Sequence, residues 1–141
     1  MKPILGFIEA LVLPKLDIVC HAKVDTGACS SSLHADNIET YEQNGSLYVR
    51  FHVFFNQNGM LINRYCEGQV ISTRTVASSN GQKSDRYIIR TPISLHGKTW
   101  EIDLNLSHRG SMKYPMLLGR EAIAGRFLVD VERTFVAQVT P

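Results

Sequence analysis

The sequence has few cysteines, little net charge and no long apolar run. Its three cysteines, Cys20, Cys29 and Cys66, cannot all pair within one chain, which favours reduced thiols and a cytoplasmic location. A periplasmic location stays open if a leader has been removed. The formal charge of +2 comes from interspersed acids and bases, so we expect no nucleic-acid partner. No window is apolar enough to cross a bilayer, so no membrane contact is expected.

Apolar and polar residues alternate through much of the chain. Every second residue is apolar over residues 47–55 and again over residues 100–106, which is the pattern of half-buried strands. Four dipeptides typical of tight hairpin turns punctuate these runs: Asn44-Gly45, Asn58-Gly59, Asn80-Gly81 and His96-Gly97. The sequence therefore predicts a mostly antiparallel β structure.

One helical segment is expected, over residues 120–124. It follows Gly119 and is ended by Gly125, which can take the left-handed conformation at a helix end. Its flanks, residues 116–118 and 127–129, are short apolar runs typical of buried strands. At 141 residues the chain is long enough for one core and short for two, so we expect one domain over residues 1–141. Many short strands with one late helix favour a small closed β-barrel.

Two short motifs carry the functional signal. Residues 22–28 read Ala-Lys-Val-Asp-Thr-Gly-Ala, so Asp25 ends an apolar strand, Thr26 adds a hydroxyl, and Gly27 lets another backbone approach closely. Much later, residues 116–120 read Met-Leu-Leu-Gly-Arg and precede the expected helix. An Asp-Thr-Gly tripeptide alone could be an ordinary turn, but the second motif makes a reactive site the better interpretation.

The paired motifs resemble those of the retropepsin-like aspartic peptidases. The resemblance implies that Asp25 is catalytic, that Thr26 braces the active-site loops, and that Gly27 lies near the substrate backbone. It implies a supporting role for the residues of the second motif: Leu117, Leu118, Gly119 and Arg120. The fold that it implies is the acid-protease form of the closed barrel, with one short helix in the C-terminal half.

A narrower similarity covers nearly the whole chain. Four segments are similar to the bacterial family labelled "ATP-dependent zinc protease": residues 23–38, 87–92, 100–102 and 111–130. That family is described as retropepsin-like and is often associated with ATP-grasp ligases that add glutamate to proteins or peptides. The similarity implies an aspartic endopeptidase with a functional link to such a ligase, and glutamate-modified proteins or peptides as candidate substrates.

The sequence contains one Asp-Thr-Gly and no second Asp-Thr-Gly or Asp-Ser-Gly. Amide hydrolysis by carboxylates uses two of them, one to take a proton from water and one to donate to the carbonyl oxygen. We therefore expect a C2 homodimer in which Asp25 meets its symmetry mate. Asp130 also follows an apolar run but lacks a following glycine, so we interpret it as a strand-end or turn residue.

Substrate contacts are expected at Ala28, beside the acid, and on a hairpin over residues 75–86. This hairpin, with Ser79, Asn80 and Gly81 at its tip, is a candidate flap over the substrate, and a plain exposed loop is the alternative. Five arginines would suit an acidic substrate: Arg86, Arg90, Arg109, Arg120 and Arg126.

No metal or cofactor is expected. The nearest grouping of thiols and imidazoles matches no common zinc pattern: Cys20, His21, Cys29 and His34. Residues 97–99 mimic the end of a phosphate-binding loop but lie in a hairpin turn. We expect Cys29 to be a buried thiol that fills a gap. Two alternatives stay open, a catalytically silent member that binds peptide in the same cleft, and a zinc-dependent hydrolase.

Overall fold

The computed structural model describes residues 1–77, 80–108 and 112–137. The strands within these ranges, in chain order, are β1 (Ile4–Leu5), β2 (Ile8–Leu13), β3 (Ile18–Asp25), β4 (Ser31–His34), β5 (Asp36–Gln43), β6 (Ser46–Gln57), β7 (Met60–Ala77), β8 (Lys83–Leu95), β9 (Lys98–Ser107), β10 (Met116–Gly119) and β11 (Leu128–Val129). The one helix of the described part is α1 (Arg120–Ile123). Strands therefore dominate the chain, as the alternating pattern predicts.

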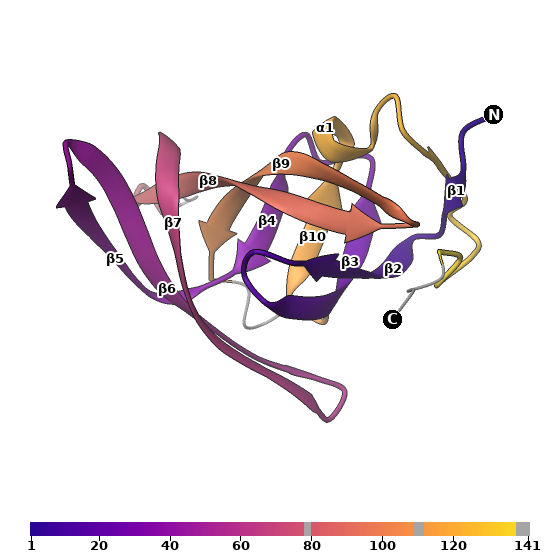
Figure 1. Cartoon of the computed structure of the whole chain (residues 1–141), viewed down its shortest axis with the longest axis horizontal. Coiled ribbons are helices and arrows are strands. Elements are labelled where there is room, and N and C mark those ends of the chain that lie inside the picture. Colours follow the sequence, from indigo (N-terminus) through magenta and orange to yellow (C-terminus); the bar gives the residue numbers. More distant parts are fainter. Residues whose placement is uncertain (78–79, 109–111, 138–141) are drawn as a thin grey trace.

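Six strands close into a barrel in the order β2-β3-β10-β4-β9-β8 (Figure 1). The ring is completed where β2 pairs with β8, through Val12 and Ser94. The interior is filled by aliphatic side chains, among them Leu13, Leu104 and Leu118, each with 0% of its surface exposed. Burial of such a side chain contributes roughly 1.5–3 kcal/mol, which makes this core the main source of stability. The expected closed barrel with one short helix is confirmed.

The alternation of the sequence fixes which face of each strand points inward. Along β3, Ile18, Cys20, Ala22 and Val24 are buried while the residues between them are not. Successive side chains of a strand point to opposite faces, so a strand with a period of two buries one side only. The same alternation governs β9, whose apolar face points into the barrel as expected.

The four expected hairpin turns all join consecutive strands. The turns at residues 44–45, 58–59 and 96–97 have positive φ at both central residues, for example 53° at Asn44 and 78° at Gly45. This is the geometry of the tightest hairpins, whose twist matches that of the flanking strands. In the turn between β7 and β8, Gly81 has φ of 84°.

The sheet continues beyond the barrel as an arm made of β7, β6 and β5 (Figure 1). The first part of β7 pairs with β6 and the second part with β8. The hairpin between β6 and β7 folds back against the barrel. The Gln57 side-chain oxygen holds it there by accepting the backbone N–H of His21 at 2.8 Å. Arg64 also donates from Nε to the Asp17 carbonyl oxygen at 2.8 Å, so both sides of this hairpin are fastened.

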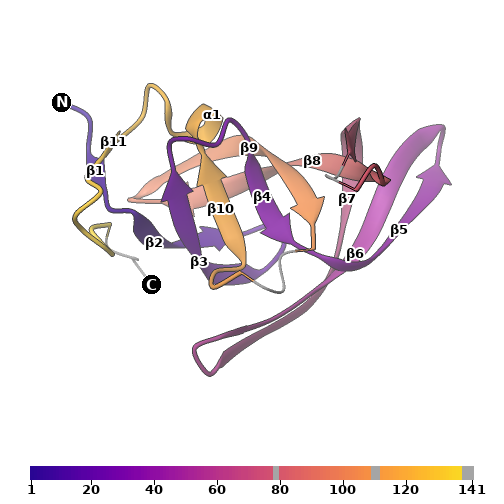
Figure 2. The same ribbon diagram turned by 180° about the vertical axis from the view of Figure 1, so that it is seen from behind.

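The first and last strands lie together, where β1 pairs with β11 in a small parallel sheet outside the barrel (Figure 2). The expectation of a buried strand over residues 127–129 is wrong in part, since Leu128 is 53% exposed. The reason is that β11 pairs with a two-residue strand rather than joining the barrel.

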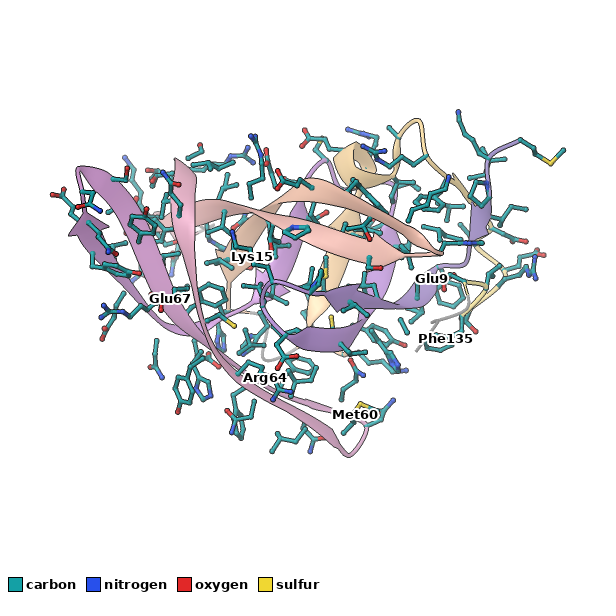
Figure 3. The ribbon with its side chains drawn as sticks, viewed as in Figure 1. Glu9, Lys15, Met60, Arg64, Glu67 and Phe135 are labelled. Carbon is teal, nitrogen blue, oxygen red and sulfur yellow. The ribbon has the colours of Figure 1, made fainter. Side chains whose placement is uncertain are left out.

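Glu9 anchors the C-terminal segment from a fully buried position beside Phe135 (Figure 3). Its Oε2 accepts the N–H groups of Gly6 at 2.6 Å and Val136 at 3.0 Å, and its Oε1 accepts that of Ala137 at 3.0 Å. A buried carboxylate is tolerated only when such donors replace water.

No helix in the described ranges is long and apolar enough to span a membrane.

Candidate active site

The two sequence motifs lie side by side. β10 runs between β3 and β4, parallel to the first and antiparallel to the second (Figure 2). In this register Gly119 is the partner of Asp25. The end of β10 is therefore placed directly against the loop that carries the acid.

The Asp25 carboxylate is held by its own loop. Its Oδ1 accepts the Gly27 N–H at 2.9 Å, and the carbonyl oxygen of Asp25 accepts the Ala28 N–H at 3.3 Å. Asp25 is half-buried, while Thr26 and Gly27 are exposed. The loop thus orients one carboxylate toward an open surface, and the bracing role expected of Thr26 stays a prediction that requires a second chain.

Gly119 fits where no side chain could. A Cβ at this position would lie 2.4 Å from the Ser30 carbonyl oxygen, far inside van der Waals contact. The Gly119 N–H donates to Ser31 Oγ at 3.0 Å in a buried hydrogen bond. The glycine therefore allows the loop from β3 to β4 to close down on β10.

The start of α1 completes the support of the acid loop. The backbone N–H of Arg120 donates to the Ala28 carbonyl oxygen at 2.7 Å, and that of Glu121 to the Cys29 carbonyl oxygen at 3.0 Å. The Arg120 guanidinium lies 2.7 Å from Cys29 Sγ and 3.5 Å from the Thr26 carbonyl oxygen. The expectation of a buried Cys29 is wrong: the thiol is exposed, because it sits on the outer side of this loop beside Arg120.

Asp25 opens onto a groove of about 490 Å³ lined mostly by apolar side chains. Phe7 and Leu117 contribute to its walls, and Tyr114 comes from the connection between β9 and β10. Among the described residues of this lining, Asp25 is the only acid and Lys23 and Lys113 are the only cations. The volume of the groove lies in the range of ligand-binding pockets, and its described lining offers one carboxylate.

The family model described as "Retropepsin-like aspartic endopeptidase RimB" matches residues 4–140. The chain belongs to the RimB-like family. The resemblance to retropepsin-like peptidases is confirmed, and the catalytic role of Asp25, Thr26 and Gly27 stays a prediction.

Curated relatives of this RimB-like chain carry a different name. A "Probable alpha-L-glutamate ligase" of Shewanella pealeana is 42% identical over 135 residues, which cover 95% of this chain and 30% of the relative. One of Desulfotalea psychrophila is 40% identical over 134 residues, covering 92% of this chain and 28% of the relative. The chain therefore spans less than a third of the length of these relatives.

A solved structure shares the fold of this RimB-like chain over almost its full length. It is a protein of unknown function from Legionella pneumophila, 33% identical, with a TM-score of 0.79. The match covers 98% of this chain and 100% of the Legionella chain. The barrel with its arm is thus a shared architecture and no peculiarity of one sequence.

The structure does not bring the expected flap residues to Asp25 within one chain. Asn80 and Gly81 lie in the turn between β7 and β8, on the arm side of the molecule (Figure 1), and neither lines the groove. Ser79 lies outside the described residues. The flap role of the 75–86 hairpin stays a prediction.

Part of the groove lining was not expected from the sequence, namely Met112, Lys113 and Tyr114. They follow β9 and carry no motif, so only their position before β10 could have pointed to them. The basic side chains of the groove are likewise lysines and not the expected arginines.

Two of these arginines, Arg90 and Arg126, contact other side chains away from the groove. Arg90 forms an ion pair with Asp103 at 2.9 Å, which raises the pKa of the guanidinium. Arg126 lies over the Trp100 ring, with its guanidinium carbon 5.1 Å from the ring centroid. Arg109 lies outside the described residues. Asp130 accepts the Glu132 N–H at 3.0 Å, as expected of a turn residue.

The nearest grouping of thiols and imidazoles in the sequence, Cys20, His21, Cys29 and His34, does not form one site. Cys20 is buried, as is Cys66 outside this grouping, and burial raises the pKa of their thiols to about 12 and about 11. Thiols with such pKa values stay protonated and are poor ligands at neutral pH. Within the described ranges, no cluster of potential ligands contains Cys20, His21 or Cys29.

Proposed function

We propose that this RimB-like chain is an aspartic endopeptidase that acts as a C2 homodimer. The observation that carries the proposal is the position of Asp25. Its carboxylate is oriented by its own loop and lies at a groove of about 490 Å³ whose described lining holds no other acid. A symmetry-related Asp25 would supply the missing partner. One carboxylate then takes a proton from water while the other donates a hydrogen bond to the scissile carbonyl oxygen, and no covalent intermediate forms.

The surface around the β1–β11 sheet supports a second copy. Within residues 4–7 and 128–135, which form and flank this sheet, five large apolar residues are exposed, from 37% for Phe7 to 72% for Val131: Ile4, Phe7, Leu128, Val131 and Phe135. Phe7 also lines the groove, so this apolar surface is continuous with the site. The outer edges of a two-stranded sheet have unpaired backbone groups that a symmetry mate can pair with.

Activity is expected to follow dimer formation. Sedimentation velocity and initial rates of peptide cleavage, measured over the same protein concentrations, should give a specific activity that rises in parallel with the dimer fraction. Val131→Asp should weaken the dimer by an order of magnitude or more, because it places an unpaired charge in the proposed interface.

Met60→Asp is the matched control, since Met60 is 57% exposed at the tip of the β6–β7 hairpin (Figure 3). It should leave both dimer and activity unchanged. Monomers that cleave peptide with undiminished specific activity would contradict the proposal.

Glutamate-rich peptides are the substrates that we infer. The relatives named glutamate ligases point to glutamate chains as the related chemistry, and a peptidase in functional partnership with such a ligase would remove what the ligase adds. Lys23 and Lys113, both exposed at the groove, place positive charge beside Asp25, where acidic side chains flanking the scissile bond would lie.

Charge reversal at Lys23 or Lys113 should lower the preference for glutamate. The measurement is kcat/KM for a glutamate-containing peptide relative to its glutamine analogue. Each reversal should reduce this ratio about tenfold, the size of one lost hydrogen bond to a charged group. Lys15→Glu, the same charge change at an exposed residue away from the groove, is the control. An unchanged ratio of the two kcat/KM values in the Lys23→Glu, Lys113→Glu double variant would show that these lysines do not determine the preference for glutamate.

A further inference from the structure

Two histidines and one aspartate converge where the barrel meets the arm. His34 ends β4, Asp36 begins β5, and His108 follows β9. His34 Nε2 lies 2.8 Å from Asp36 Oδ2, and His108 Nδ1 lies 2.9 Å from Asp36 Oδ1. The three potential ligand atoms lie within 4.8 Å of one another. None of these residues takes part in the proposed peptide hydrolysis.

The cluster is part buried and part open, as a metal site with a water ligand is. The His34 side chain is 2% exposed, that of Asp36 29% and that of His108 74%. The Phe55 ring packs against the His34 ring with centroids 5.5 Å apart, so the buried imidazole is fixed in place. A fixed donor, a carboxylate and an open side give three protein ligands and room for solvent.

We propose that His34, Asp36 and His108 bind one divalent zinc ion per chain. Neutral imidazole and carboxylate together suit zinc better than they suit magnesium or calcium, which prefer oxygen ligands. Zinc bonds of about 2.0–2.1 Å in a tetrahedron place ligand atoms about 3.3 Å apart. The two hydrogen-bonded distances therefore need to open by about half an ångström, and the distance between the two histidine nitrogens, which is at most 4.8 Å, needs to close by up to about 1.5 Å. The exposed His108 can supply both shifts.

The ion would fasten a junction and would take no part in catalysis. The backbone N–H of His34 donates to the Pro115 carbonyl oxygen at 2.7 Å, and the backbone N–H of Ala35 donates to the Ser107 carbonyl oxygen at 2.9 Å. His108 and Pro115 thus bracket the segment whose residues 112–114 line the groove. The site lies at the opposite end of β4 from the acid loop, roughly 10 Å along the strand. Zinc here fixes the base of one groove wall without touching the reacting atoms.

Isothermal titration of metal-free protein with zinc chloride tests the proposal. We expect one zinc ion per chain, and a rise in Tm of roughly 5–10 °C at a zinc concentration near 100 times Kd. Magnesium chloride should give neither effect. His108→Gln keeps the exposed position filled by a polar side chain, and it should weaken zinc binding by more than the roughly 10- to 100-fold that loss of an outer-shell partner costs.

Asp36→Asn should have the same effect, and circular dichroism checks that both variants fold. His52→Gln is the control, because His52 is another histidine of the surface, hydrogen-bonded to Asn63 and outside the cluster. It should bind zinc as the wild type does. Absence of one-to-one zinc binding in the wild type, or zinc binding undiminished in His108→Gln, would overturn the proposal and leave the cluster as a hydrogen-bonded clamp.

Discussion

Replacing Asp25 by Asn is expected to abolish peptide cleavage and leave the barrel intact. The carboxylate accepts a hydrogen bond from the Gly27 N–H of its own loop, and the amide oxygen of Asn can accept the same bond. The amide cannot take a proton from water, so kcat/KM should fall by on the order of 10²- to 10⁴-fold or more. Cleavage of a fluorogenic glutamate-rich peptide measures the activity, and thermal unfolding measures the fold.

Asp130→Asn is the matched control, because Asp130 is also an acid after an apolar run, and its carboxylate accepts the Glu132 N–H in a turn, a bond that the amide oxygen of Asn can also accept. It should retain full activity. Retained cleavage in Asp25→Asn, combined with its loss on chelation, would instead support the zinc-hydrolase alternative. A wild type that binds the peptide without cutting it under any condition would support the catalytically silent alternative.

Mixed dimers extend the same experiment to the shared site. When wild-type and Asp25→Asn chains exchange subunits at equal concentrations, about a quarter of the dimers carry two carboxylates. If both acids are needed, activity should fall with the square of the wild-type fraction. A linear fall would mean that each subunit works alone, and it would contradict the proposed dyad.

Part of the barrel was predictable because its signals are local. His96-Gly97, between the barrel strands β8 and β9, sets positive backbone angles within two residues, and the alternation over residues 100–106 assigns each side chain to a face. The pairing of the acid loop with β10 was also foreseeable, since Gly119 is required by a close backbone approach. The turn and the alternation need no knowledge of distant segments, whereas the pairing of Asp25 with Gly119 joins distant segments and was expected from the family resemblance.

What escaped the sequence depends on contacts between distant segments. The β6–β7 hairpin is held against the barrel by the contact between Gln57 and His21 of β3, and a glutamine within an alternating strand does not predict such a contact. The exposure of Cys29 depends on where Arg120 holds its loop. The cluster around Asp36 joins histidines from separate strands, so no spacing rule for metal ligands could find it.

The burial of Glu9 was also not predictable from the sequence, because an acid near the start of the chain is expected at the surface. Its burial follows from the C-terminal segment, whose Val136 and Ala137 N–H groups it accepts. With the Gly6 N–H included, both carboxylate oxygens face donors only. The first and last segments are therefore coupled through one side chain, beside the surface where we propose that a second copy docks.

Glu9→Gln is accordingly expected to destabilise the fold by about 3 kcal/mol, although the two side chains have the same shape. The amide places an NH₂ group where an oxygen accepted N–H groups, so donor faces donor in a buried site. Tm should fall by roughly 10 °C, and hydrogen exchange at Val136 and Ala137 should accelerate most. Glu42→Gln, at an exposed position of β5, should change stability by less than about 0.5 kcal/mol. Equal stability of the two variants would show that the C-terminal segment does not depend on this carboxylate, and an intact dimer in Glu9→Gln would separate that segment from the proposed interface.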